Sequence, residues 1–181
     1  MYVACSGDNT VHVIQTRTLE KKGEEADSSR RLWDGTREII STSLYPQSPE
    51  GSTPDALAVS PDGRTLFVAN ADNNCLSVYD VSKAGESHAL GFIPTGWYPT
   101  SVRCAGSVVF VANGKGSSSS PNPQGPNPYE REEDSHASQY IGQMYQGTLS
   151  GITAPTIQEL DVYSRLVYEN CPYNKPGELQ A

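Results

Sequence analysis

A short apolar segment recurs three times along this chain of 181 residues. The segments are Tyr2-Val3-Ala4-Cys5, Phe67-Val68-Ala69-Asn70 and Phe110-Val111-Ala112-Asn113, and they are separated by 65 and 43 residues. The longer spacing requires an insertion, and the polar stretch 20–37 supplies one that reads as a solvent-exposed loop. The repeat therefore predicts a chain made of similar units.

The middle unit shows the plan of one repeat most clearly. A short apolar run at 56–60 leads through Pro61-Asp62-Gly63 to a second run at 65–70, which is rich in aromatic and β-branched residues. Proline presets φ for a turn and glycine accepts a positive φ, so the tripeptide predicts a tight turn. A second turn at 72–74 precedes 76–81, where apolar and polar side chains alternate as in a half-buried strand. The unit is therefore an antiparallel meander without a helix.

Repeats of about 40 residues with several strands each are typical of β-propeller blades. We therefore predict an all-β fold, a partial β-propeller of two to three four-stranded antiparallel blades over residues 1–152, with a C-terminal α-helix. Blade boundaries are expected near 38 and 91, loop insertions at 20–37 and 114–139, and the closing strands of the third unit at 140–145 and 147–152.

The number of units has a physical consequence. The first unit begins at what should be its second strand, and a closed propeller covers each blade with its neighbour. Two or three blades leave two apolar faces open. We therefore expect a fragment of a longer chain, with an oligomerising protein as the alternative.

The spacing of apolar residues changes after residue 152. Thr156-Ile157-Gln158-Glu159 is a capping box, and Pro155 before it suits a helix entrance. The predicted apolar face consists of Ile157, Leu160, Tyr163 and Val167, with Leu166 beside them. Asn170 and Pro172 end the helix. Residues 153–181 are therefore expected to form an exit helix and a tail.

Composition excludes several classes of partner. The chain has 13 basic and 21 acidic residues, a net charge of −8, and an acidic surface repels phosphate backbones, so nucleic acid is not an expected partner. A run of 18 apolar residues is missing, so a membrane-spanning helix is not expected. The residues after Met1 show no basic start with an apolar core, so the chain carries no predicted signal peptide.

Candidate metal and nucleophile residues follow no functional pattern. Cys5, Cys75, Cys104 and Cys171 form no C-x-x-C pair and have no histidine at ligand spacing, which favours small buried thiols and leaves a disulfide open if the protein is exported. His12 alternates with two valines and should face away from them, while His88 and His136 lie in polar segments. Asp8-Asn9 and Asp72-Asn73-Asn74 suit turns better than calcium loops. We predict no metal, no cofactor and no catalytic residue.

Three segments carry a resemblance to a known family. Residues 60–70, with Ser-Pro-Asp-Gly followed by Phe67-Val68-Ala69-Asn70, are similar to the YVTN or YncE-like family of β-propeller repeats. Residues 76–81 look like the closing strand of that family. Thr95-Gly96-Trp97-Tyr98-Pro99-Thr100 looks like its inter-blade signature, in which glycine precedes a proline at the next strand.

A narrower resemblance covers residues 43–54, 110–128 and 147–173. These segments look like the C-terminal blades of bacterial proteins that fuse such a propeller to an alkaline-phosphatase-superfamily phosphoesterase domain. The resemblance implies an exported protein, periplasmic or extracellular, whose exit helix leads towards the phosphoesterase domain. The metal ligands and the Ser/Thr nucleophile of that superfamily are not present in this sequence, so its activity is not assigned to these residues.

The candidate ligand- or partner-facing residues gather around the third repeat. They are Trp97, Tyr98, Asn113, Lys115, Asn122 and Asn127. Gly114-Lys115-Gly116-Ser117 lacks the frame of a phosphate loop, but one lysine among amides and hydroxyls suits a loop at the propeller mouth or against a following domain. Aromatic residues at a blade edge more often pack between blades than bind ligands, and that alternative stays open for Trp97 and Tyr98.

The best functional interpretation is therefore a non-catalytic interaction or scaffold module. Its expected partners are the missing blades, the adjacent phosphoesterase domain or a second copy of the chain. The alternative is a propeller enzyme, a lactonase-like hydrolase or a quinoprotein-like dehydrogenase, with a metal or cofactor in a central channel.

Overall fold

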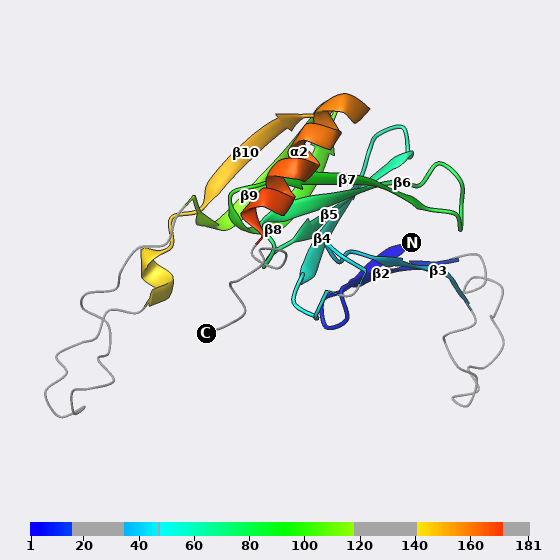
Figure 1. Ribbon diagram of the computed structural model, residues 1–181, viewed down its shortest axis with the longest axis horizontal. Helices are drawn as coiled ribbons and strands as arrows, with labels where there is room; N and C mark the ends of the chain where they lie inside the picture. The colour runs from blue at the N-terminus through cyan, green and yellow to red at the C-terminus, as the bar shows by residue number, and fades with distance from the viewer. Residues whose placement is uncertain (16–34, 47, 118–140, 172–181) are drawn as a thin grey trace, which may run out of the picture.

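The computed structural model describes residues 1–15, 35–46, 48–117 and 141–171 of the chain (Figure 1). The elements in chain order are β1 (Tyr2–Cys5), β2 (Thr10–Ile14), β3 (Thr36–Ser41), β4 (Pro54–Val59), β5 (Thr65–Asn70), β6 (Cys75–Asp80), β7 (His88–Pro94), β8 (Trp97–Ala105), β9 (Val108–Gly116), the 3-10 helix η3 (Ile141–Met144), β10 (Thr148–Thr153) and α2 (Ile157–Asn170). The described strands form three antiparallel sheets. The predicted all-β fold with a C-terminal helix is confirmed, and the sheets have the arrangement of a partial propeller.

The middle sheet is the predicted meander with a fourth strand added. Its order is β4-β5-β6-β7, and the first turn follows from side-chain chemistry. The Asp62 carboxylate accepts hydrogen bonds from the Ser60 hydroxyl and the Arg64 amide, and Gly63 takes a φ of 75°. An acidic side chain that bonds two residues onward and a glycine at positive φ together close a tight turn.

Both faces of the middle sheet are buried. Leu66, Val68 and Tyr79 pack against the first sheet, where they meet Val11 and Ile40. Their strand neighbours Phe67, Ala69, Leu76 and Val78 point the other way and pack against the third sheet. The strand predicted at 76–81 is present as β6, but the prediction that it is half-buried is wrong, because β6 has a packed sheet on each side.

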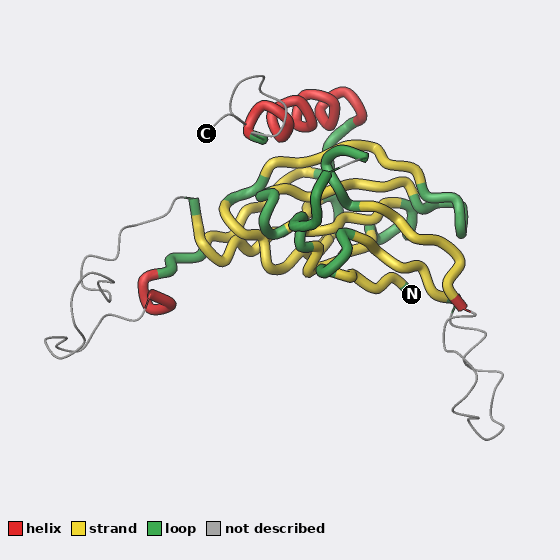
Figure 2. The backbone as a smooth tube through the Cα atoms, turned by 60° about the horizontal axis from the view of Figure 1, so that its bottom comes forward, coloured by secondary structure: helices red, strands yellow, loops and turns green. Residues whose placement is uncertain are grey.

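The two outer sheets each have one packed face and one open face. In the first sheet, β1-β2-β3, Val3 pairs with His12 and His12 with Ile39, opposite the face that carries Val11. His12 thus faces away from Val11 and Val13, as predicted. In the third sheet, β8-β9-β10, the open face carries Phe110 and Leu149, which are 38% and 71% exposed. Tube and ribbon views show the sheets as successive layers (Figure 2).

The edges of the predicted units differ in detail from the observed sheets. Strand β4 contacts both β1 and β8, the strands at the near edges of the two neighbouring sheets. The sequence positions 38 and 91 fall inside β3 and β7, and the chain changes sheet after those strands. The strand expected at 147–152 is β10, but residues 141–144 form the 3-10 helix η3, because β9 is already flanked by β8 and β10 and leaves no edge to pair.

Helix α2 lies across the outer strand of the middle sheet (Figures 1 and 2). The predicted capping box is present, with the Thr156 hydroxyl accepting from the Glu159 amide and the Glu159 carboxylate accepting from the Thr156 amide. Leu160 and Val167 are buried as predicted, whereas Ile157, at the first position of the helix, is 62% exposed, so its predicted place on the buried face is wrong. None of the helices in these ranges is long and apolar enough to cross a membrane.

Candidate functional site

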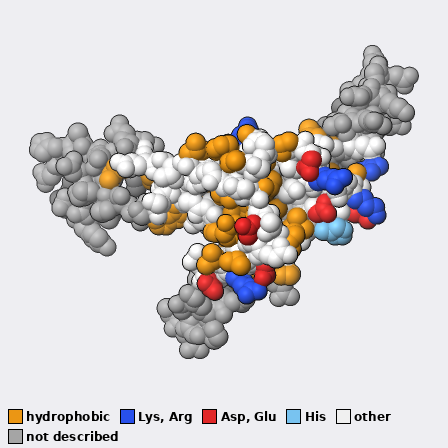
Figure 3. Space-filling model, turned by 90° about the horizontal axis from the view of Figure 1, so that it is seen from above, with side chains coloured by type: hydrophobic (Ala, Val, Ile, Leu, Met, Phe, Trp, Pro, Cys, Tyr) orange, Lys and Arg blue, Asp and Glu red, His pale blue; other side chains and the backbone are white. Residues whose placement is uncertain are grey.

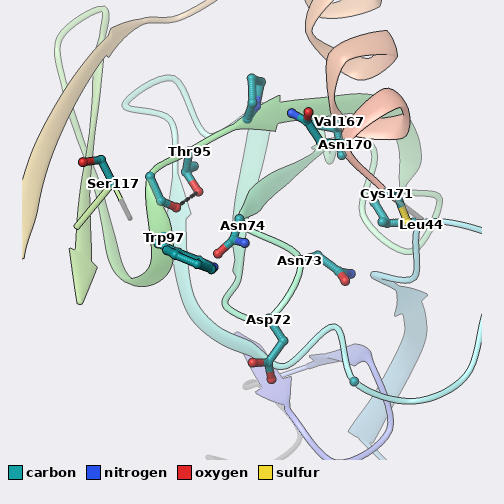
Figure 4. Close-up of a pocket in the computed structure, with 13 residues that line it drawn as sticks. Leu44, Asp72, Asn73, Asn74, Thr95, Trp97, Ser117, Val167, Asn170 and Cys171 are labelled. Carbon is teal, nitrogen blue, oxygen red and sulfur yellow. Dashed lines mark hydrogen bonds between the residues drawn. The ribbon is translucent and has the colours of Figure 1, made fainter. Parts of the chain in front are cut away.

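A cavity of about 730 Å³ opens beside the C-terminal end of α2 (Figure 4). It is walled by the turn between β5 and β6, by the connection from β7 to β8 and by the last turn of the helix. Its polar lining comes from Asp72, Asn73, Asn74, Thr95, Ser117 and Asn170. Its apolar lining includes Leu44, Pro94, Trp97, Val167 and Cys171. A cavity of this size with a few convergent polar groups is typical of small-ligand sites.

One side of the cavity is formed by an arrangement that occurs twice in the fold. In this arrangement, which we call the corner, an asparagine in a strand-connecting turn bonds the segment that leads into the first strand of the next sheet. Asn9 and Asn74 follow equivalent strands and both take a left-handed backbone, with φ of 57° and 52°. The Oδ1 atom of Asn9 accepts from the amides of Gly51 and Ser52, at 3.1 and 2.8 Å. That of Asn74 accepts from the Tyr98 amide at 2.8 Å. Asparagine tolerates this backbone best among non-glycine residues, which explains its use at both turns.

Each asparagine holds the segment that enters the next inner strand. Both segments have glycine three residues before a proline, and the residue before the proline has positive φ, 52° at Thr53 and 61° at Tyr98. Gly96 has no room for a side chain, because a Cβ atom there would lie 2.7 Å from the Asn113 amide nitrogen and 2.8 Å from the Gly116 carbonyl oxygen. This close approach fixes the corner that presents Trp97 to the cavity.

The predicted site residues fall into three groups. Trp97 lines the cavity with 37% of its surface exposed, and Tyr98 beside it lies under the Lys115 ammonium, which is 4.0 Å from the ring centroid. Asn113 is buried, and its amide donates to the hydroxyls of Thr148 and Ser150 at 3.1 Å each. Asn122 and Asn127 lie outside the described residues. The structure therefore brings four of the six together at the start of β8 and the end of β9.

Sequence reasoning assigned the acidic turn of the middle unit to turn chemistry alone. The structure makes Asp72 part of the cavity wall, where its carboxylate accepts from the Thr53 hydroxyl at 2.5 Å. Partial burial raises the pKa of the nearby Asp55 carboxyl, and the negative charge of Asp72 raises it further. Asn170 joins the same wall from a helix almost 100 positions away, so local sequence held no signal for it.

The other candidates show no catalytic arrangement. Among residues 1–15, 35–46, 48–117 and 141–171, no three His, Cys, Asp or Glu side chains are grouped as metal ligands. The segment that resembles part of a phosphate loop begins inside β9, which continues through Gly116. All four cysteines are free thiols, and burial raises the pKa of Cys75 to about 12.

Comparison with known proteins gives a family and distant structural neighbours. Residues 1–120 match the sequence model described as "Lactonase, 7-bladed beta-propeller". Among solved structures, hydrazine synthase of Kuenenia stuttgartiensis is similar, with 20% identity, 62% of this chain and 25% of that chain covered, and a TM-score of 0.45. A functionally unknown protein from Desulfotomaculum acetoxidans DSM 771 shares 21% identity over 63% of this chain and 31% of that chain, with a TM-score of 0.42.

No curated protein matches the chain. The chain spans about a quarter to a third of the length of the two solved structures. The family match covers about two thirds of the 181 residues and agrees with the stacked antiparallel sheets. The chain belongs to the lactonase family of seven-bladed β-propellers.

Proposed function

We propose that this chain is a non-catalytic interaction module, a run of propeller blades whose open faces bind further blades of the same protein. The observation that carries the proposal is the contrast between the sheets. The middle sheet buries Leu66 and Leu76 completely, one on each face, whereas the outer sheets leave Leu149 71% and Ile39 58% exposed. Apolar side chains exposed on the flat face of a sheet favour a role for that face in binding another surface.

The side chains on the open face of the third sheet support a neighbouring blade as its partner. On the third sheet, Phe110 and Ala112 on β9 lie beside Leu149 on β10 and Arg103 on β8. Such a face offers the small and large apolar side chains that the buried faces of the middle sheet use for packing. A family of seven-bladed propellers provides a neighbouring blade as the simplest cover for this surface.

We further propose that the parent protein is an exported bacterial protein, periplasmic or extracellular, of the YVTN or YncE-like type. Its propeller would stand beside a phosphoesterase domain of the alkaline-phosphatase superfamily. The support is the resemblance of the repeat and exit-helix segments, together with the outward side of α2, where Val162 and Leu166 are 54% and 42% exposed. Seen from above the view of Figure 1, groups of hydrophobic side chains are spread over the described surface, while most of the charged side chains gather on the right and at the bottom of the view (Figure 3).

A metal and activity assay on the purified chain tests the non-catalytic assignment. Circular dichroism first establishes that the chain is folded. Mass spectrometry then measures bound metal, and a panel of lactones and phosphate esters measures turnover. We expect no stoichiometric metal and no turnover. Stoichiometric metal or a turnover rate that scales with the chain concentration would contradict the assignment.

The second candidate is a lactonase-like hydrolase with its site in a central channel. The description of the matching family, which names lactonase, favours it. In that case the adjacent first strands of the second and third sheets, β4 and β8, would form part of the channel wall. Turnover of a lactone that is lost on substitution of side chains from those strands would favour the enzyme over the module.

A further inference from the structure

We propose that the cavity between the β5–β6 turn, the β7–β8 connection and the end of α2 binds an organic cation, a primary or quaternary ammonium group. The described part of the cavity lining comes from the β3–β4 connection, the β5–β6 turn, the β7–β8 connection with the start of β8, the residue after β9, and the end of α2. Three separate features of the wall favour positive charge.

The first feature is the charge of the lining. Asp72 is the one ionised side chain among the described lining residues, and neither lysine nor arginine contributes to that set. The Asp55 carboxyl lies nearby, and its pKa is raised by burial first and by the negative charge of Asp72 in addition. The nearest described lysine at this corner, Lys115, is held over the Tyr98 ring and is not part of the lining. This local charge repels anions such as phosphate and attracts cations.

The second feature is the end of the helix. Val167, Asn170 and Cys171 belong to the last turn and C-cap of α2, and all three line the cavity. A helix C-terminus carries about half a negative charge on its unpaired carbonyl groups. The last turn of α2 contains no basic residue that would neutralise it. The helix therefore adds negative potential to the side of the cavity opposite Asp72 (Figure 4).

The third feature is the aromatic wall. The Trp97 side chain extends into the cavity next to Asn74, from the corner fixed by Gly96 (Figure 4). An exposed indole attracts an ammonium group through its ring face, and tryptophan is the strongest of the aromatic residues in this role. Asp72, the C-terminus of α2 and the Trp97 indole all line this cavity, and together they favour a small cation over a neutral or anionic ligand.

The test is saturation-transfer NMR with choline chloride as the probe. The matched ligand is 3,3-dimethylbutan-1-ol, which replaces the quaternary nitrogen of choline with carbon and has no charge. We expect saturable transfer to the choline methyl protons and an affinity for the alcohol at least about fivefold weaker, as removal of a cation–π contact implies. Equal binding of the two probes, or no saturable choline signal from the folded chain, would overturn the proposal.

Two variants locate the site. Asp72→Asn removes one negative charge and Trp97→Leu removes the indole, and each should weaken choline binding at least about fivefold. Asp62→Asn is the matched control, because it removes the same charge from the β4–β5 turn at the other end of the sheet and should leave binding unchanged. Circular dichroism verifies that each variant is folded. If the control weakens binding as much as Asp72→Asn, choline responds only to net charge and the assignment of the cavity is wrong.

Discussion

Single side chains in left-handed turns decide how one sheet is joined to the next. The Asn74 carboxamide reaches across 24 positions to the Tyr98 amide, and Asn9 makes the same kind of bond to residues 51 and 52. Both pairs hold a strained residue ahead of a proline, Tyr98 in one case and Thr53 in the other. Such strain persists only where surrounding bonds fix the backbone.

Replacement of Asn74 by alanine should therefore destabilise the chain. The variant loses the hydrogen bond from the Tyr98 amide. It also places alanine at a φ of 52°, a backbone conformation that asparagine tolerates better. We expect a decrease of about 1–3 kcal/mol in the free energy of unfolding, measured by urea titration. Asn74→Gly separates the two causes, because it relieves the backbone and still lacks the bond. Unchanged stability of the alanine variant would mean that the corner does not depend on this side chain.

The buried thiol of Cys75 and the buried hydroxyl of Tyr79 predict that the free energy of unfolding depends on pH. Burial raises the pKa of the Cys75 thiol from 9.0 to about 12 and that of the Tyr79 hydroxyl from 10.0 to about 12. The unfolded chain ionises first as the pH rises, so the stability that the neutral groups retain below pH 9 is lost between about pH 9 and 12.

Urea unfolding at pH 7.5 and pH 10.5 measures this loss. The wild-type chain should be less stable at the higher pH, and Cys75→Ala should lose part of the difference because one buried ionisable group is gone. Cys5→Ala is the matched control, since it removes a thiol that is only partly buried, whereas Cys75 is fully buried. An identical pH dependence in the wild type and Cys75→Ala would contradict the assignment to Cys75.

At the scale of elements, a glycine sets the distance between α2 and the middle sheet. Gly91 in β7 takes a φ of 149°, and a Cβ atom there would collide with the Ser164 hydroxyl and lie 3.1 Å from Leu160. The same hydroxyl accepts from the Phe92 amide at 2.8 Å. The close approach therefore needs both a small residue on the strand and serine on the helix.

Gly91→Ala should separate the helix from the sheet. We expect a loss of about 1–3 kcal/mol in the free energy of unfolding and faster hydrogen exchange along α2 than in the wild type. Gly7→Ala serves as the control, because a Cβ atom at that turn meets no neighbour within 4 Å. Equal protection of α2 in both variants would show that the helix does not rest on this contact.

The elements themselves were largely predictable, and the errors have physical causes. Turn residues and the capping box placed β4, β5, β6 and α2 correctly, because those signals are local. The burial of β6 was not predictable, because Ser77 reads as a polar outward residue until a second sheet covers it. The 3-10 helix η3 replaced an expected strand for the same reason, since the pairing of β9 depends on distant segments.

The candidate site shows the same division between local and distant information. Trp97 and Tyr98 were identified from the glycine and proline around them, which are local signals. The combination of Asp72, Trp97 and Asn170 in one cavity was not, because these residues come from a turn, an inter-sheet connection and a helix. Asn170 reaches Asp72 and Trp97 because α2 packs on β7.

At the scale of the whole molecule, the repeat predicts stacked blades and the structure shows which faces remain uncovered. The middle sheet is protected on both sides by Val11 and Ile40 of one neighbour and by Val102 and Val111 of the other. The outer sheets are antiparallel too, with three strands each, and within the part of the chain that the structure describes each of them packs against one sheet, the middle one. We therefore expect the open faces of the outer sheets to associate with other apolar surfaces, as both faces of the middle sheet do within the chain.

Light scattering coupled to size-exclusion chromatography tests the association of the open faces most directly, because it measures the molar mass of the wild-type chain and of Leu149→Asp in solution. We predict that the wild type associates beyond one chain at micromolar concentration and that Leu149→Asp, on the open face of the third sheet, shifts the population towards single chains. Val162→Asp, which places the same charge at an exposed apolar position of α2, should not produce that shift. The claim that the open sheet faces are blade interfaces would be contradicted by a wild-type chain that is monomeric and melts cooperatively, with the same molar mass and melting behaviour in Leu149→Asp.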